Sequence, residues 1–210
     1  MTSLLNAERP PLLCPGCAHE RITHTLDQAF QKMDLARHQI VIVSDIGCSG
    51  LFDTFFHTHA MHGLHGRALT YAAGLKMARP ELNVIVSMGD GGQGIGGAHL
   101  LAACRRNINL TLLILNNFNF GMTGGQFSPL SGVGTKATTA PLGNIDHGFD
   151  IAQLATAAGG FEHGRVLFEL ARIGVEILVG AELQGIDEDA HAYTIVLLAG
   201  PTHEAEVSFV

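Results

Sequence analysis

Residues 83–97 read NVIVSMGDGGQGIGG, and residues 110–120 read LTLLILNNFNF. Each stretch begins as a near-continuous apolar run and ends in polar or glycine residues, which is typical of a strand buried in the middle of a sheet. Between them, AHLLAACRR at 98–106 has the composition of a helix. Strands that alternate with helices in this way predict an α/β fold with a parallel sheet covered by helices on both faces.

The same alternation extends toward the N-terminus. IVIVSD at 40–45 predicts another buried strand, and helices are predicted at 19–33 and 66–78. In parallel sheets, ligands collect at the carboxyl ends of the strands. Those ends are the most polar and glycine-rich stretches of the chain: SDIGCSG (44–50), GDGGQGIGG (89–97) and NNFNFGMTGGQ (116–126).

The pattern changes after about residue 135. DIAQLATAAGG at 150–160 predicts one more helix, but the remainder contains short strand-like runs separated by turns, at 175–186, 192–200 and 204–210. These runs predict a short β-rich tail, arranged as an antiparallel meander. We therefore divide the chain into a domain over residues 1–160 and a divergent C-terminal segment over 161–210.

Composition excludes several classes of protein. The 210 residues are 47% hydrophobic and 15% charged, which suits one folded domain and suggests that part of the exterior is covered in an oligomer. A net charge of −7 with scattered Lys and Arg argues against a nucleic-acid partner. The sequence has neither an apolar run long enough to cross a membrane nor a signal-type N-terminus, so we expect a cytoplasmic protein with reduced cysteines.

Asp90 and Asn117 are candidates for a divalent-cation site. Asn117 lies 27 residues beyond Asp90, and each follows a predicted neighbouring strand. Their side-chain oxygens, with a backbone carbonyl such as that of Asn119, could converge on one hard cation that also binds diphosphate oxygens. Taken singly, GDG is a turn and NN a strand terminus. The pair at this spacing resembles the diphosphate-binding signature of thiamine-diphosphate enzymes.

The resemblance extends to one family of these enzymes. CPGC, IGCSG, GLHGRA, GDG, IGGAH, CRRNI, NN and GMTGGQFSP occur in the order and spacing seen in the β-subunit of 2-oxoacid:ferredoxin oxidoreductases. The resemblance covers about residues 12–160, and CPGC with GMTGGQ is specific to this family among thiamine enzymes. It implies oxidative decarboxylation of a 2-oxoacid with coenzyme A, giving an acyl-CoA, carbon dioxide and reduced ferredoxin.

The resemblance also assigns site residues. Mg²⁺ would be held by Asp90, Asn117 and the Asn119 carbonyl. Contacts to thiamine diphosphate are expected from Gly47, Cys48, Ser49, His65, Gly66, Gly89, Asp90, Gly91, Gly92, Asn117, Asn119, Gly121, Met122 and Thr123. Arg67 is expected to be structural. The acid that activates the cofactor belongs to the α-subunit in this family, so the chain is expected to form half of an active site. Gly92 departs from the family, in which an acidic residue commonly follows GDG.

The CxxC of LCPGCAHE at 13–20 leaves a zinc knuckle, a dithiol and an iron–sulfur site open by itself. The family resemblance implies a [4Fe–4S] cluster bound by Cys14, Cys17 and Cys48. Cys104 lies in the middle of a predicted helix and is expected to be a small buried thiol. No cysteine follows it, so a fourth ligand would come from another residue type or from a partner subunit.

Three further features leave alternatives open. The spacing of His57, His59, His62 and His65 suits neither one helical face nor a familiar zinc pattern. The tail after about residue 160 weakly resembles a strand–turn–strand piece of flavin-dependent disulfide reductases. Other functional hypotheses are a subunit of a non-redox thiamine-diphosphate decarboxylase or synthase, which has no need for three thiols, and a scaffold that has lost its active site. The identity of the 2-oxoacid is left open.

Overall fold

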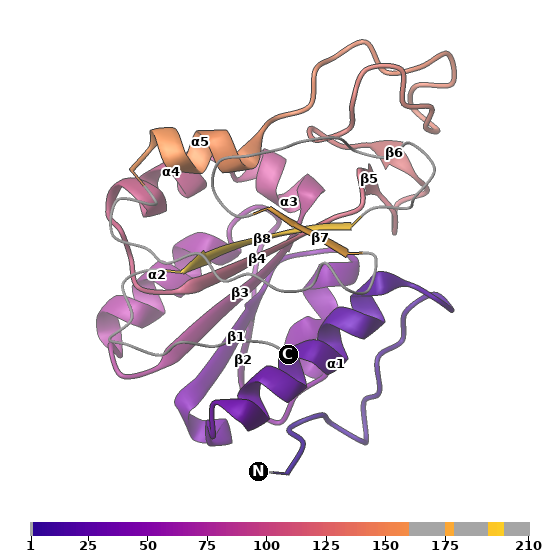
Figure 1. The fold of residues 1–210 in the computed structure, drawn as a ribbon. Helices are drawn as coiled ribbons and strands as arrows, with labels where there is room; N and C mark the ends of the chain where they lie inside the picture. Colours follow the sequence, from indigo (N-terminus) through magenta and orange to yellow (C-terminus); the bar gives the residue numbers. More distant parts are fainter. Residues whose placement is uncertain (1, 160–174, 179–192, 200–210) are drawn as a thin grey trace.

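The structure is a computed structural model, and it describes residues 2–159, 175–178 and 193–199. Its centre is a six-stranded sheet in the order β2-β1-β3-β4-β8-β7. The first four strands of this order are parallel: β2 (His59–His62), β1 (Ile40–Ser44), β3 (Asn83–Gly89) and β4 (Thr111–Asn116). Helices cover both faces, which confirms the predicted fold class (Figure 1).

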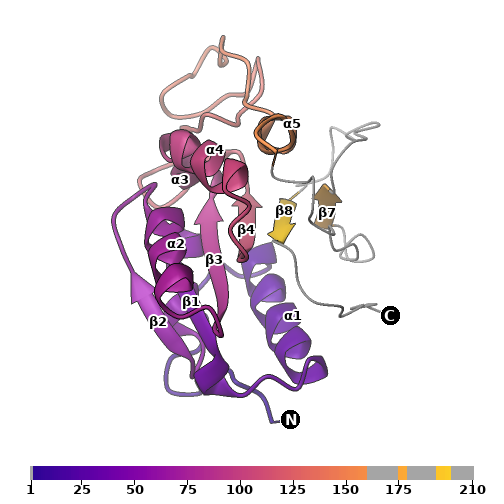
Figure 2. The same cartoon turned by 90° about the vertical axis from the view of Figure 1, so that its left-hand side faces the viewer.

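Alternate residues of the central strands point to opposite faces of the sheet, and both faces are buried beneath helices. One core packs against α2 (Ala68–Ala78), α4 (Gly97–Arg105) and α5 (Ile151–Ala157), and contains Val41, Val43, Val84, Val86, Met88, Leu112 and Ile114. The other packs against α1 (Ala18–Lys32) and contains Ile40, Ile42, Phe52, Phe55, Phe56, Ile85, Leu113 and Leu115. Figure 2 shows α2, α3 and α4 on one side of the sheet and α1 on the other.

The strand predicted at 40–45 and the helices predicted at 19–33, 66–78 and 98–106 lie within one or two residues of the observed β1, α1, α2 and α4. The region between β1 and α2 was not predicted in detail: it forms a 3-10 helix, η2 (Cys48–Thr54), and then the edge strand β2. The glycine-rich stretch after β3 is itself a short helix, α3 (Asp90–Ile95), that precedes α4. Smaller elements are the 3-10 helix η1 (Arg37–Gln39) and the hairpin of β5 (Asn119–Phe120) and β6 (Gln126–Phe127).

The strand pairing in the tail corrects one prediction. β8 (Tyr193–Ala199) pairs antiparallel with β4, so it extends the main sheet. β7 (Val175–Leu178) pairs parallel with β8, so the expected antiparallel meander is wrong for this pair. A parallel pair needs a crossover between its strands, whereas the meander assumed tight turns. The predicted strand at 204–210 lies outside the described residues.

None of the helices in the described part of the chain combines the length and the apolar character that crossing a membrane requires.

Candidate cofactor site

The carboxyl ends of β1, β3 and β4 lie side by side and carry the candidate residues. In the paired register, Ser44 of β1 lies opposite Ser87 of β3, and Gly89 of β3 lies opposite Leu115 of β4. The chain therefore delivers Asp45, Asp90 and Asn117 to one edge of the sheet. The sequence predicted this edge because parallel strands all end on the same side.

Three oxygen atoms converge where β3 and β4 end. The Asn117 side-chain oxygen lies 3.0 Å from Asp90 Oδ1 and 3.0 Å from the Asn119 carbonyl oxygen. If the amide is turned over, its nitrogen donates to both atoms instead. Without a cation the turned-over amide is the favourable orientation, whereas a hard divalent cation at this point would take the amide oxygen and the two neighbouring oxygens as ligands. The structure thus brings Asp90, Asn117 and Asn119 together, and their binding of Mg²⁺ stays a prediction.

The turn that follows β4 explains how Asn119 returns to Asn117. Phe118 has a positive φ of 59°, which is uncommon for a residue with a side chain, and its N–H donates to Asn116 Oδ1 at 3.0 Å. Asn119 Nδ2 then donates to the Asn117 carbonyl at 2.8 Å. The strained turn therefore places the Asn119 carbonyl beside the Asn117 side chain.

Asp90 has the properties of a carboxylate that needs a ligand. Its side chain is buried, and its Oδ2 has no hydrogen-bond partner among the described residues. Burial raises the pKa of Asp90 above its ordinary value. A buried carboxylate with an unpaired oxygen is costly, and a bound cation would offset that cost. These residues therefore fit a Mg²⁺–diphosphate group.

Glycines let other parts of the chain approach α3 closely. A Cβ at Gly91 would lie 2.2 Å from the Phe120 ring, so that ring rests against the backbone of α3. A Cβ at Gly89 would lie 3.2 Å from Ser49 Oγ, which puts η2 beside the end of β3. Ser87 Oγ also donates to the Ser49 carbonyl at 2.9 Å. These contacts bring the predicted residues Ser49, Gly89 and Gly91 to the same edge.

His65 lies at this edge and is paired with a carboxylate that the sequence did not single out. Its Nδ1 is 2.9 Å from Asp45 Oδ2, and the Gly66 N–H donates to Asp45 Oδ1 at 2.7 Å. The His65 ring also meets Phe120 edge-on, with centroids 6.1 Å apart. Asp45 could have been suspected because it follows β1 directly, as Asp90 follows β3.

Met122 and Thr123 lie in the turn between β5 and β6 and are exposed. Gln126 Nε2 donates to the Thr123 carbonyl at 2.6 Å, and this bond closes the turn. Gly121 precedes them, and a Cβ there would lie 3.2 Å from Asn119 Oδ1. Contacts of Met122 and Thr123 with a cofactor or substrate stay predictions.

The three predicted cluster cysteines are gathered near one another. Cys14 is exposed, whereas Cys17 and Cys48 are partly buried, and the Cys17 N–H donates to the Cys14 carbonyl at 2.9 Å. The pKa of Cys48 is raised, first by burial and then by the nearby charges of Cys17 and Cys14. Gly47, at the start of this segment, has a φ of 88° that favours glycine.

Within the described ranges, no group of three or more histidine, cysteine, aspartate or glutamate side chains is arranged to hold one metal ion. In a [4Fe–4S] cluster, each cysteine binds a different iron, so its ligands do not converge on a single point. The gathering of the three thiols is therefore compatible with a cluster, and the cluster stays a prediction. Cys104 is buried in α4, as expected, and burial raises its pKa to about 11.

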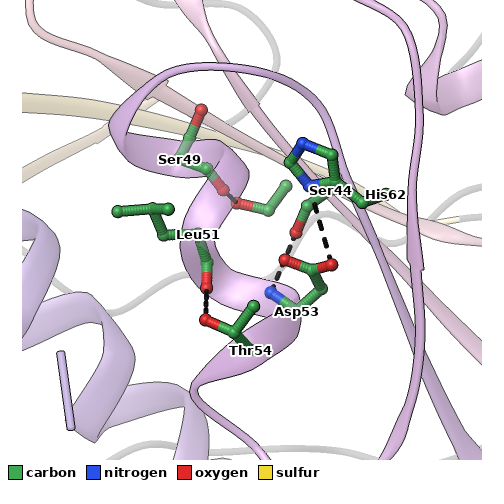
Figure 3. Close-up of polar contacts among 7 residues, drawn as sticks. Ser44, Ser49, Leu51, Asp53, Thr54 and His62 are labelled. Atoms are coloured by element: carbon green, nitrogen blue, oxygen red, sulfur yellow. Dashed lines mark hydrogen bonds and ion pairs between the residues drawn. The ribbon is translucent and has the colours of Figure 1, made fainter. Parts of the chain in front are cut away.

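Other residues in and after the histidine-rich stretch lie in β2 or just before α2. His59 and His62 belong to β2, and His62 Nδ1 lies 3.6 Å from Asp53 Oδ2. Figure 3 shows Asp53 between His62 and Ser44, whose hydroxyl accepts from the Asp53 N–H at 3.0 Å. Arg67 precedes α2 and donates to the Gly66 carbonyl at 3.4 Å.

Sequence reasoning also missed Gln93. Its side chain in α3 is 1% exposed, and neither amide atom has a hydrogen-bond partner among the described residues. A glutamine inside a glycine-rich stretch gives no sign of burial, because glycine-rich stretches are usually exposed turns.

Comparisons with known proteins agree on the kind of site. The family model "Thiamine pyrophosphate enzyme, C-terminal TPP binding domain" matches residues 45–171. The chain is 47% identical over 151 residues to the 2-oxoglutarate synthase subunit KorB of Archaeoglobus fulgidus, covering 71% of this chain and 56% of that protein. It is 44% identical over 149 residues to the 2-oxoacid:ferredoxin oxidoreductase subunit beta of Saccharolobus solfataricus, covering 70% of this chain and 49% of that protein.

A solved structure is also similar. It is a 2-oxoglutarate:ferredoxin oxidoreductase from Magnetococcus marinus with 2-oxoglutarate, coenzyme A and succinyl-CoA bound. The TM-score is 0.72 at 25% identity, and the match covers 95% of this chain and 84% of that one. The chain spans about half the length of the curated relatives that it matches.

Proposed function

Because the chain belongs to the family described as the C-terminal TPP binding domain of thiamine pyrophosphate enzymes, we propose that it is the β-subunit of a 2-oxoacid:ferredoxin oxidoreductase. The observation that carries the proposal is the convergence of Asp90, Asn117 and the Asn119 carbonyl at the carboxyl edge of the sheet. The similarity to β-subunits named for this activity supports it.

In this proposal, residues 1–160 form the cofactor-binding domain and 161–210 a divergent segment. Asp90, Asn117 and Asn119 hold Mg²⁺ and, through it, the diphosphate. The backbone at Gly47, Gly89 and Gly121 and the Ser49 side chain would contact the diphosphate, and His65 would contact another part of the cofactor. When bound, thiamine diphosphate supplies the carbon nucleophile that attacks the 2-oxo carbon and accepts the electrons left when carbon dioxide departs.

The chain's residues act by positioning. By holding the diphosphate at the strand ends, these residues would orient the rest of the cofactor before substrate arrives. Phe120 rests on α3 and its ring meets the His65 ring, so it helps to fix the position of His65.

Cys14, Cys17 and Cys48 would hold a [4Fe–4S] cluster, and the cluster would supply the electron transfer to ferredoxin. The fourth ligand would come from a residue other than cysteine or from a partner. The three thiols lie close enough together for Cys17 and Cys14 to contribute to the raised pKa of Cys48, and this proximity supports the assignment. A cluster of this kind needs cysteines kept in the reduced form, as in a reducing compartment, and we therefore propose a cytoplasmic enzyme.

We further propose that an α-subunit completes the active site and supplies the acid that activates the cofactor. Leu12, Leu142 and Ile145 are 83%, 97% and 86% exposed, which fits a chain that covers apolar surface with another subunit. Coenzyme A and a 2-oxoacid would be the substrates. We propose 2-oxoglutarate as the first 2-oxoacid to test, because named relatives act on it.

The test is to purify the chain anaerobically with its partner subunit and to measure dye reduction that depends on coenzyme A and a 2-oxoacid. 2-Oxoglutarate, pyruvate and a branched 2-oxoacid should be compared. We expect reduction with at least one acid and none in Asp90→Ala. Aldehyde release without dye reduction or iron absorbance would instead support a non-redox thiamine-diphosphate decarboxylase. Failure with every acid, despite bound cofactor and iron, would contradict the proposal.

A further inference from the structure

The Asp45 carboxylate fixes the chemistry of the His65 ring. Asp45 is completely buried, and its two oxygens have different partners: Oδ1 accepts from the Gly66 N–H at 2.7 Å, and Oδ2 lies 2.9 Å from His65 Nδ1. A carboxylate can only accept, so Nδ1 must carry the proton of this bond. In the neutral ring, Nε2 is then left with a lone pair.

Nε2 is available to a bound molecule. The His65 side chain is 35% exposed, and Nε2 has no hydrogen-bond partner among the described residues. The His65 and Phe120 rings form a T-shaped pair, and the Phe120 ring rests on Gly91, the residue after Asp90. His65 is therefore held close to the candidate Mg²⁺–diphosphate site on one side and is open on the other.

Gly92 shows why the carboxylate comes from Asp45. A Cβ at position 92 would lie 2.0 Å from Asp45 Oδ2 and 3.5 Å from His65 Nδ1. The space that an acidic side chain after GDG would enter is thus already filled by a carboxylate from the end of β1. The Asp45 carboxylate and an acidic side chain at position 92 would occupy the same space, so the chain has one and not the other.

Resting on the proposed function, we propose that Asp45 replaces the acid that commonly follows GDG in this family, and that it is a positioning residue that holds His65 with its Nε2 lone pair facing the bound reactants. This ring accepts a hydrogen bond from a hydroxyl or amino group. It repels a carboxylate, so it does not hold the carboxylate of the 2-oxoacid.

The same arrangement allows a balanced proton transfer. An O–H or N–H bond of the bound molecule breaks, its proton moves to Nε2, and the electron pair stays on the oxygen or nitrogen. The neutral imidazole becomes imidazolium, while Asp45 stays a carboxylate and stabilises the new charge by direct contact. No oxidant or further reactant is needed for this step.

The tautomer can be read directly by nitrogen NMR of the chain labelled with ¹⁵N-histidine, at a pH of about 8, above the ordinary histidine pKa of about 6.5. His65→Gln identifies the signal by its loss. We expect Nδ1 protonated and Nε2 unprotonated in the parent. A protonated Nε2 in the parent would overturn the proposal, and this readout depends on neither cofactor nor activity.

Asp45→Asn gives a sharper test. The Gly66 N–H keeps the amide oxygen on its own side, so the amide nitrogen faces His65 Nδ1 and must donate to it. The proton should therefore move to Nε2, and the two nitrogen shifts should exchange. An unchanged tautomer would contradict the proposal. Asp53→Asn, which alters the buried carboxylate beside His62, is the matched control and should leave the His65 signal in place.

Moving the carboxylate tests the replacement itself. In the double variant Asp45→Gly/Gly92→Asp, the acid enters the same space from α3 and should restore the parent tautomer, which Asp45→Gly alone should lose. Failure of the double variant to restore it would reject the replacement.

In the complex with the partner subunit, Asp45→Asn should lower kcat about 10²- to 10⁴-fold, with thiamine diphosphate still bound and KM for coenzyme A nearly unchanged. Full activity in Asp45→Asn would reject the positioning role. An inactive parent complex would instead count against the proposed function.

Discussion

Gly92→Ala adds one methyl group at the point where α3 meets the Asp45–His65 pair. The new Cβ would lie 2.0 Å from Asp45 Oδ2 and 2.9 Å from its Cγ, far inside van der Waals contact. Asp45 cannot turn away without loss, because it is buried and both its oxygens are engaged. The methyl group must therefore displace a carboxylate that has no other place to go.

The expected cost follows from three terms. Overpacking a buried site costs about 1–3 kcal/mol, and losing a hydrogen bond to a charged group costs about 1.5–3 kcal/mol. Replacing glycine by alanine in a helix returns about 1 kcal/mol. We expect Gly92→Ala to lower the free energy of unfolding by about 1.5–5 kcal/mol, a large part of the 5–15 kcal/mol typical of a domain.

Urea unfolding followed by circular dichroism measures this change. Gly74→Ala is the matched control: Gly74 lies in the middle of α2, and an added Cβ would meet nothing within 4 Å. It should raise the free energy of unfolding by up to about 1 kcal/mol. In an Asp45→Ala background the penalty of Gly92→Ala should largely disappear, because the carboxylate it displaces is gone. A Gly92→Ala variant as stable as the parent, or a penalty that persists without Asp45, would refute this reasoning.

Three further predictions concern other residues. Gln93→Met keeps a similar side-chain volume and removes two buried amide atoms that lack partners among the described residues. It should raise the free energy of unfolding of the cofactor-free chain, measured in urea, by about 1–3 kcal/mol. A loss of stability would contradict this. Burial raises the pKa of Cys104 from 9.0 to about 11. Above about pH 9 the unfolded state therefore loses this proton before the folded state does, and the free energy of unfolding should fall as the pH rises toward 11. In urea titrations across this pH range, Cys104→Ala should lack this part of the fall. Cys14→Ser, Cys17→Ser and Cys48→Ser should each lower the iron content after anaerobic purification, whereas Cys104→Ser should not. Equal iron content in all four variants would contradict the cluster assignment.

The strands that hold the site could be predicted because their residues are apolar on both faces. Strand β3, for example, has five consecutive buried residues, and such runs stand out in any sequence. Once the strands were placed, the meeting of Asp90 with Asn117 followed from their parallel order. The contact with the Asn119 carbonyl was proposed with them, and the turn at Phe118 explains how it forms.

The Asp45–His65 pair could not be predicted in the same way. The two residues are 20 positions apart, and η2 and β2 lie between them. β2 is an edge strand with three exposed residues out of four, so it carries no apolar run. The contact depends on a turn and an edge strand, neither of which leaves a periodic signal.

The predicted antiparallel pairing in the tail was wrong for a related reason. Short apolar runs show that strands are present, but they do not show which strands pair. The meander assumed that neighbours in sequence pair with each other in opposite directions. Instead, β8 joins β4 across the sheet, and β7 then pairs parallel with β8.

The most direct test of the cofactor site is calorimetric titration of the chain with thiamine diphosphate in the presence and absence of Mg²⁺. We expect binding that requires Mg²⁺ and that weakens in Asp90→Asn. The loss of affinity should be at least about 10- to 100-fold, the loss typical when a residue that supports a metal ligand is removed. Asp53→Asn, another buried carboxylate with an oxygen that lacks a partner among the described residues, should bind as the parent does. Binding that survives in Asp90→Asn, or that is independent of Mg²⁺, would contradict the site formed by Asp90, Asn117 and Asn119.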